Sequence, residues 1–325
     1  MRKKIVIAVG GTGGHVLPAM KIGKRLSDKF DLVYMGVGLS KNEFFDKEVG
    51  PFKDVEGGGK SLGFFKCILN NIKGILEARK FLHEIKPEKV IGFGSYHSFP
   101  VLAAAAYLGI SYDLFEFNVI PGRVNRLFSK GAKKVFIHFQ PQKKRLRGNL
   151  IPIDFAFEDH SLVSQQSARI HFGLEAEKKT ILVFGGSQGA RAINEAINEV
   201  RDQLTDQFQF LHFSGTPFCN RMDLAWTASD FAICRSGAGA MREILIYEKP
   251  AILIPYPNAK DDHQTYNANY MKDIVKGAYH IKQSEISPEL LKKTIMNMYE
   301  KLPTIKAHIA AYKAEKKNDS FLNHI

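Results

Sequence analysis

Short apolar strands alternate with helical patterns along the first half of the chain. Residues 4–9 predict a buried strand, and after a run of glycines the apolar positions of residues 16–26 recur at helical spacing. A strand, a glycine turn and a helix in this order open a mononucleotide-binding unit. The pattern also predicts strands over 32–35, 89–93 and 134–138 and an alanine-rich helix over 101–108.

The same order of elements begins again near residue 180. Alternating strands and helices favour parallel sheets that are covered by helices on both faces. At about 150 residues per domain, a chain of 325 residues suits two such domains. We therefore predict an α/β protein with two Rossmann-like, doubly wound parallel-sheet domains, residues 1–150 and 151–306. The second half predicts strands over 180–184, 208–213, 231–234 and 251–254, a glycine turn over 185–189 and a helix over 190–200.

The cysteines and the apolar stretches limit where the chain can work. Cys67, Cys219 and Cys234 are odd in number and widely spaced, and they form no metal-like or disulfide pattern, which indicates a reducing compartment. The basic start of the chain runs straight into a strand, without a signal-peptide cleavage region. The longest apolar stretch, residues 100–110, is well short of the roughly 20 residues that a membrane span needs.

The positive charge of the chain is concentrated in the first predicted domain. Residues 1–150 hold 26 Lys and Arg against 12 Asp and Glu, whereas the rest of the chain is close to neutral. A well-solvated basic surface, a nucleic acid, an anionic membrane or an acidic substrate would each account for this charge.

The first glycine turn, residues 10–15, has the composition of an anion-binding loop. Its four glycines allow close backbone approach, and the next helix supplies unpaired N–H groups and the positive end of its dipole. The turn is no dinucleotide fingerprint, because Val16 stands where the last glycine belongs, and this excludes an NAD-dependent oxidoreductase. His15 is a candidate general base, and the alternative is a histidine that caps the helix.

A second turn, residues 185–191, offers a similar anion site with the side chains of Ser187 and Gln188. The alternative is a tight turn with a serine cap. A third turn begins at Arg235 and Ser236, and Glu243 follows on its helix. A carboxylate there can accept two hydrogen bonds from a ribose diol, or it can simply be favoured by the helix dipole.

A polar segment, residues 261–267, contains His263 and Gln264. A metal site would need further ligands at characteristic spacing, and neither such a cluster nor an Asp-x-Asp motif is present in the sequence. We therefore predict a sugar-binding loop here and no metal or other cofactor.

Several of these stretches resemble the MurG family of glycosyltransferases. The family is of the GT-B type (glycosyltransferase family 28), inverting and metal-independent. It moves GlcNAc from UDP-GlcNAc to the MurNAc 4-hydroxyl of undecaprenyl-pyrophosphoryl-MurNAc-pentapeptide (lipid I) in peptidoglycan synthesis. The resemblance implies a peripheral enzyme on the cytoplasmic face of the bacterial inner membrane. The matching stretches are GGTGGHVLPA (10–19), GFGSYHS (92–98), FEFNVIPGRVNRLFS (115–129), GGSQGARAINE (185–195), CRSGA (234–238) and PYPNAKDDHQTYNA (255–268).

The resemblance also implies roles for individual residues. His15 would be catalytic, the first domain would bind lipid I and the second UDP-GlcNAc, and residues 307–325 would return to the first domain. The acceptor-binding residues implied are Thr12, Gly13, Gly14, Tyr96, Glu116 and Asn118. The donor-binding residues implied are Ser187, Gln188, Gly189, Phe218, Cys219, Arg235, Ser236, Glu243, His263 and Gln264.

The chain departs from the family pattern at three places. Phe115 and Phe117 replace two polar residues of a His-Glu-Gln-Asn motif, and Asp154 stands where the family has an arginine near the donor phosphates. A carboxylate there would repel a diphosphate by roughly 1 kcal/mol or more. Residues 214–225 are also short, since the family carries an extra strand and helix before the turn that contacts uracil.

A lysine-rich apolar segment of the first domain predicts contact with an anionic membrane. Each lysine near such a surface adds roughly 1 kcal/mol of attraction. The alternative is an amphipathic helix whose apolar stripe faces the core. The residues concerned are Lys60, Phe64, Phe65, Lys66, Ile68, Leu69 and Lys73.

Two other functions remain as alternatives, and a third is excluded. A degenerate, non-catalytic homologue would recruit lipid-linked precursor or division proteins, which the changes at Asp154 and residues 214–225 favour. A GT-B glycolipid synthase would use another acceptor, such as a diacylglycerol. A nucleic-acid binder would explain the charge but not the paired phosphate loops, so we expect no nucleic-acid partner.

Overall fold

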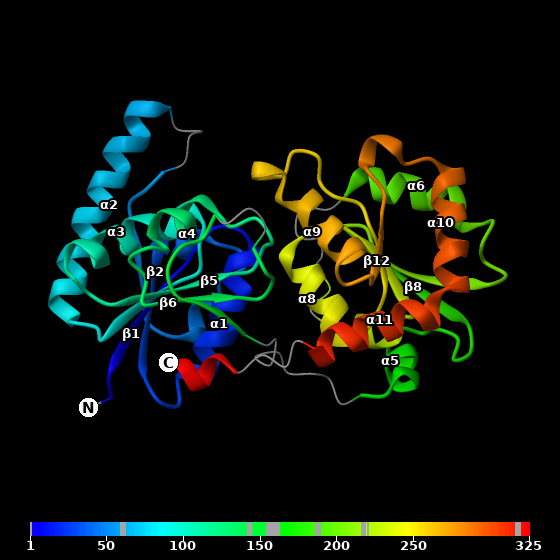
Figure 1. Ribbon diagram of the computed structural model, residues 1–325, viewed down its shortest axis with the longest axis horizontal. Coiled ribbons are helices and arrows are strands. Elements are labelled where there is room, and N and C mark those ends of the chain that lie inside the picture. The colour runs from blue at the N-terminus through cyan, green and yellow to red at the C-terminus, as the bar shows by residue number, and fades with distance from the viewer. Residues whose placement is uncertain are drawn as a thin grey trace. The chain divides into compact units, whose positions relative to one another are not determined.

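The computed structural model describes residues 2–58, 63–141, 145–153, 163–185, 190–215, 219, 221–315 and 320–325. The chain divides into two compact units, unit 1 (Met1–Glu158 with Asn318–Ile325) and unit 2 (Asp159–Lys317). Each unit is built on its own sheet, and all strand pairs in both sheets are parallel (Figure 1). The predicted α/β fold class is confirmed.

Unit 1 contains a seven-stranded sheet in the order β3-β2-β1-β4-β5-β6-β7. Its strands are β1 (Lys4–Ala8), β2 (Asp31–Val37), β3 (Phe52–Val55), β4 (Lys89–Gly92), β5 (Tyr112–Glu116), β6 (Lys134–Ile137) and β7 (Leu150–Pro152). Its helices are α1 (Gly13–Leu26), α2 (Phe64–Ile85), α3 (Phe99–Tyr107) and α4 (Arg123–Phe128).

Both faces of this sheet are buried, as expected for a parallel sheet. In β1, Val6 and Ala8 join one apolar cluster with side chains of α2, α3 and α4. Ile7 points to the opposite face, where α1 packs so closely that a Cβ on Gly23 would lie 3.0 Å from its Cδ1 atom. The division between the units falls after Glu158, whereas the sequence predicted it after residue 150, because β7 pairs with β6 and so belongs to unit 1.

The last residues of the chain complete the core of unit 1. Phe321, in the short 3₁₀ turn Phe321–His324, is 2% exposed and lies edge-on to Phe115 with ring centroids 5.8 Å apart. Lys134 donates a side-chain hydrogen bond to the carbonyl oxygen of His324. Figure 1 shows this turn, in red, against the blue-to-green elements of unit 1.

The helix α11 (Leu302–Glu315) belongs to unit 2, which corrects the prediction that all of residues 307–325 return to the first domain. Ile305 lies in the apolar core of unit 2, and the hydroxyl of Tyr312 is 3.0 Å from that of Tyr270. These contacts hold α11 on unit 2. Within residues 307–325, only the segment Asn318–Ile325 is part of unit 1.

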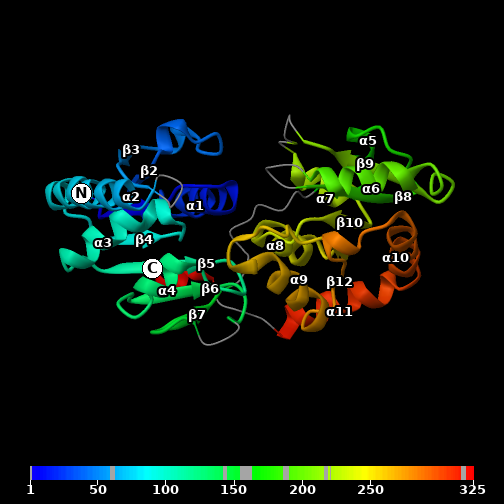
Figure 2. The ribbon, with the colours of Figure 1, turned by 90° about the horizontal axis from the view of Figure 1, so that it is seen from above.

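Unit 2 contains a five-stranded sheet in the order β12-β11-β10-β8-β9. Helices α6 and α10 pack on one face, while α8 and α9 lie together on the other (Figure 2). The strands are β8 (Lys179–Phe184), β9 (Phe208–Phe213), β10 (Phe231–Cys234), β11 (Ala251–Leu253) and β12 (Ala278–His280). The helices are α5 (Gln165–His171), α6 (Arg191–Arg201), α7 (Met222–Ala228), α8 (Ala238–Tyr247), α9 (His263–Asp273), α10 (Pro288–Glu300) and α11.

Candidate functional site

The strand order places a ligand crevice in each unit. In open parallel sheets, ligands bind at the carboxyl ends of the strands where the chain reverses its direction of winding. In unit 1 this point lies between β1 and β4, and in unit 2 between β8 and β10. The glycine turns that the sequence singled out follow β1, β8 and β10.

The turn after β1 requires its glycines. Gly11 has a φ of 92°, and a Cβ on this residue would lie 2.8 Å from Nδ1 of His97. Helix α1 then begins at Gly13, with Thr12 at its N-cap and no side-chain cap hydrogen bond. Within the described part of the chain, the N–H groups of Gly13 and Gly14 make no hydrogen bond, so they can receive an anion.

His15 is held in one tautomer. Its Nδ1 atom lies 2.8 Å from the carbonyl oxygen of Phe93, the residue after β4. A carbonyl oxygen can only accept, so Nδ1 carries the proton and Nε2 is the nitrogen that can take another one. The half-buried ring therefore has the tautomer that a general base with a reactive Nε2 requires.

The turn after β4 faces the glycine turn. Ser95 has a positive φ of 65°, and its hydroxyl lies 2.8 Å from Nδ1 of His97. Tyr96 stacks on the His97 ring at a centroid distance of 3.9 Å and is 40% exposed. The structure thus places Tyr96 beside His97, whose ring lies against the glycine turn, and it adds Ser95 and His97 to the residues around this turn. A serine and a histidine beside one glycine carry no sequence motif.

Glu116 has a different position from the one we expected for a substrate-binding group. It is 4% exposed, and its Oε1 atom accepts hydrogen bonds from the backbone N–H groups of Phe117 and Asn118, each at 3.0 Å. Its Oε2 atom accepts from the N–H of Gly122 and from Nδ2 of Asn125, each at 2.9 Å. The carboxylate therefore organises the loop between β5 and α4, in which Asn118 is half-buried.

The aromatic replacements beside Glu116 are part of the core. Phe115 is fully buried and stacks on Phe93 at 4.9 Å, with the rings 3° from parallel. Phe117 is 3% exposed and stacks against both rings at 6.1 Å. These three rings hold the segment that contains the carbonyl partner of His15.

Part of the predicted donor site lies outside the described residues, namely Ser187, Gln188, Gly189 and Phe218, together with Asp154. Cys219 is half-buried, and burial raises the pKa of its thiol. The turn after β10 leads into α8 through Gly237, which has no side-chain cap. Among the described residues, a Cβ on Gly237 or on Gly239 would meet no atom within 4 Å, so none of them packs against these positions at the start of α8.

Arg235 supports this turn from inside. It is 8% exposed and donates to the carbonyl oxygens of Ile254 and Pro255 at 3.1 Å, and burial lowers the pKa of its guanidinium. Its guanidinium carbon also lies 5.6 Å from the centre of the Tyr256 ring. The side chain therefore braces the end of β11, and its contact with the donor stays a prediction.

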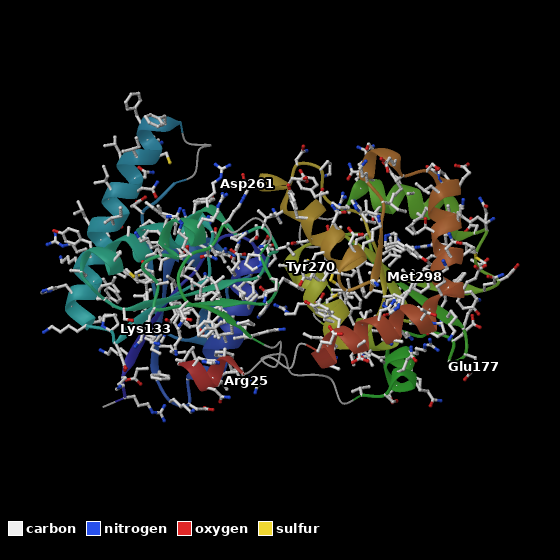
Figure 3. The ribbon with its side chains drawn as sticks, viewed as in Figure 1. Arg25, Lys133, Glu177, Asp261, Tyr270 and Met298 are labelled. Carbon is white, nitrogen blue, oxygen red and sulfur yellow. The ribbon has the colours of Figure 1, made fainter. Side chains whose placement is uncertain are left out.

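Two of the predicted donor-binding residues, Ser236 and Gln264, are in contact. Ser236 donates its hydroxyl to the carbonyl oxygen of Gln264 at 2.8 Å, and Gln264 accepts from the N–H of Tyr256 at 2.9 Å. The Nδ1 atom of His263 lies 2.8 Å from the carbonyl oxygen of Lys260. Asp261, labelled in Figure 3 in the turn ahead of α9, has a left-handed backbone with a φ of 54°.

Glu243 lies on α8, and its Oε2 atom accepts a hydrogen bond of 2.9 Å from Nε1 of Trp226. The carboxylate is half-buried, so it can still be reached by a ligand. The indole partner was not predicted, because an apolar helix with one tryptophan carries no signal for a polar role.

The N-terminal half of α2 exposes its apolar side chains. Phe64 is 74% exposed, Phe65 80% and Leu69 65%, and Ile68 is also exposed, so the alternative of a core-facing stripe is wrong for this part of the helix. The exposed Lys66 adds positive charge, whereas Lys73 pairs with Glu56 at 3.3 Å and with Glu77 at 3.8 Å. Lys60 lies outside the described residues.

Comparison with known proteins identifies the family. Residues 5–137 match the glycosyltransferase family 28 N-terminal domain, and residues 180–322 match its C-terminal domain. The UDP-N-acetylglucosamine--N-acetylmuramyl-(pentapeptide) pyrophosphoryl-undecaprenol N-acetylglucosamine transferase of Protochlamydia amoebophila (strain UWE25) is 35% identical, covering 91% of this chain and 87% of that relative. The chain belongs to the MurG family. The transferase of the same name from Bacillus subtilis (strain 168) is 32% identical, covering 89% of this chain and 88% of the relative.

Solved structures confirm the GT-B fold. The crystal structure of MurG from Acinetobacter baumannii superposes with a TM-score of 0.75 at 24% identity, covering 99% of this chain and 96% of that one. The calicheamicin glycosyltransferase CalG4 gives a TM-score of 0.67 at 12% identity, covering 95% of this chain and 94% of that one.

Among the described residues, no helix has both the length and the apolar character to cross a membrane. No group of three His, Cys, Asp or Glu side chains in that part of the chain gathers closely enough to hold a metal ion.

Proposed function

We propose that this protein transfers GlcNAc, with inversion, from UDP-GlcNAc to the MurNAc 4-hydroxyl of lipid I. The observation that carries the proposal is the fixed tautomer of His15 beside the available N–H groups of Gly13 and Gly14. A base and an anion site thereby share one helix start in unit 1. The names of the MurG relatives indicate the two substrates that we propose.

In the proposed reaction, the N–H groups of Gly13 and Gly14 bind the acceptor diphosphate. Nε2 of His15 removes the proton of the acceptor hydroxyl while this oxygen attacks the anomeric carbon from the face opposite UDP. The positive charge left on the imidazolium is stabilised by the Nδ1 hydrogen bond to the Phe93 carbonyl. Asn118 and Tyr96 line the acceptor side of this loop.

On the donor side, Glu243 accepts hydrogen bonds from the ribose diol, and Gln264 and His263 hold the GlcNAc hydroxyls. The leaving diphosphate gathers negative charge beside the uncapped start of α8, whose dipole and N–H groups stabilise it. In this proposal, fixed dipoles stabilise the leaving diphosphate, and the reaction uses no resident metal or cofactor.

We also propose that the protein works at the cytoplasmic face of the inner membrane, where lipid I is presented. The exposed Phe64, Phe65 and Leu69 would enter the interface, and Lys66 would attract anionic head groups. The excess positive charge of residues 1–150 supports the same placement.

A transfer assay tests the proposal. Purified protein receives radiolabelled UDP-GlcNAc and a lipid I analogue, and product is separated by chromatography and examined by NMR for the β-anomer. Transfer that requires both substrates supports the function. UDP binding without transfer would instead identify a recruiting homologue, and transfer only to diacylglycerol would identify a glycolipid synthase, and either result overturns the proposal.

A further inference from the structure

Trp226 is the only tryptophan of the chain, and its ring contacts the last residue of β8 and helix α8. Its ring, on α7, is fully buried. One side meets Phe184, the last residue of β8, edge-on at 5.7 Å. Tyr247 of α8 is stacked parallel to it at 6.2 Å. This packing fixes the orientation of the indole, and hence the direction of its N–H bond.

The indole has one polar atom, the nitrogen Nε1, and this atom donates a hydrogen bond to Glu243. An indole nitrogen can only donate, and a buried donor without a partner is costly. Nε1 of Trp226 lies 2.9 Å from Oε2 of Glu243, within the range of a good hydrogen bond to a charged acceptor. A rigid donor on one oxygen therefore limits the rotation of the carboxylate about its last torsion.

We propose that Trp226 is a positioning residue for the ribose of the nucleotide donor. By holding Oε2, it orients the Glu243 carboxylate so that it can accept from both hydroxyls of a vicinal diol. The inference rests on the proposed function, because it takes Glu243 as the ribose-binding residue. It identifies the hydrogen-bond donor that orients this carboxylate, namely the indole N–H of Trp226. A phenylalanine side chain at position 226 would fill most of the same space without supplying that N–H.

Replacing Trp226→Phe while varying the ligand separates positioning from packing. In calorimetric titrations, the variant should bind UDP roughly tenfold more weakly than the wild type, as expected for losing a hydrogen bond to a charged group. It should bind 2′,3′-dideoxy-UDP with unchanged affinity, because that ligand offers no diol. In the transfer assay the KM for UDP-GlcNAc should rise by a similar factor while kcat changes little.

The double variant with Glu243→Gln provides the matched control. Glu243→Gln alone should weaken UDP binding, and adding Trp226→Phe should cause no further loss, since both changes remove the same interaction. An equal loss of UDP and dideoxy-UDP binding in Trp226→Phe would overturn the inference and leave a packing role. If Glu243→Gln binds UDP as the wild type does, the ribose assignment of the proposed function is wrong instead.

The wild-type protein offers a second test that does not depend on the fold of a variant. Because Trp226 is the only tryptophan, its fluorescence reports directly on the bond to Glu243. Saturating UDP should shift the emission, whereas saturating dideoxy-UDP should leave it near that of the free protein. The same shift with both ligands would contradict the proposed coupling between the indole and the diol.

Discussion

Asn125 donates its side-chain amide to Oε2 of Glu116 at 2.9 Å, and the same nitrogen lies 2.8 Å from the carbonyl oxygen of Phe115. This pair ties α4 to the end of β5. Together with the backbone N–H groups that donate to Glu116, it fixes the loop that contains Asn118. The carboxylate is thus a structural centre of this loop, whereas the family resemblance implies a role in binding the acceptor.

Replacing Glu116→Gln should destabilise the protein by about 1–3 kcal/mol, because the new NH₂ group would face donors that the carboxylate oxygen now satisfies. Urea denaturation measures the change. Glu88→Gln is the control, since Glu88 makes only a surface ion pair with Lys3 and its loss should stay within about 0.5 kcal/mol. Equal stability of the two variants would contradict the structural role of Glu116.

His15→Ala should lower kcat about a hundredfold or more, because removal of the general base leaves the acceptor hydroxyl protonated. The transfer assay with saturating substrates measures the loss. His83→Ala, an exposed histidine near the end of α2, should keep the wild-type rate. Near-normal turnover of His15→Ala would show that this histidine only shapes the turn and that the base lies elsewhere.

Replacing Phe64, Phe65 and Leu69 together by serine should weaken binding to phosphatidylglycerol vesicles at least about tenfold, since each buried apolar side chain contributes roughly 1.5–3 kcal/mol. Sedimentation with vesicles measures the effect. Ile170→Ser is the control, because Ile170 is 71% exposed on α5 of unit 2. Lys66→Gln should lower only the part of the binding that high salt removes. Unchanged vesicle binding of the triple variant would place the membrane contact elsewhere.

Lys249 should make the stability of the protein depend on pH. Its Nζ atom donates to the carbonyl oxygen of Ser229 at 2.6 Å, and burial lowers the pKa of the ammonium from 10.5 to about 8, with Lys306 and Arg169 adding repulsion and Asp230 opposing it. Between these values the unfolded chain binds more protons, so the free energy of unfolding should rise from pH 8 to pH 10.5. Lys249→Met should lose this rise, as measured by urea denaturation at each pH, and an unchanged slope would rule the lysine out as its source.

The sequence predicts the parallel sheets and most strands because a strand buried on both faces is a continuous apolar run. Strand β5 escapes this rule. It contains Asp113, which is fully buried and pairs with Lys89 at 2.7 Å. It also contains Glu116, whose carboxylate accepts hydrogen bonds from the next loop. Two carboxylates within five residues interrupt the apolar run that would predict a buried strand, and the residues that pair with them lie in other elements.

The site is predictable where the backbone itself binds. The glycine turns and His15 are visible in the sequence, because close backbone approach and a helix start leave a local pattern. The roles of Phe93 and Trp226 are not visible, because one acts through a carbonyl oxygen and the other through a single N–H brought close by packing. The bracing role of Arg235 is not visible either, since its partners are carbonyl oxygens at the end of a neighbouring strand.

The position of Phe321 in unit 1 has a consequence for the order of events during translation. This residue is synthesised after the whole of unit 2, yet its ring packs against Phe115 in the core of unit 1. Domains otherwise tend to fold in the order of their synthesis. Unit 1 can therefore reach its final packing only after unit 2 has been made, and a chain that stops before Phe321 has a first unit that lacks this ring in its core.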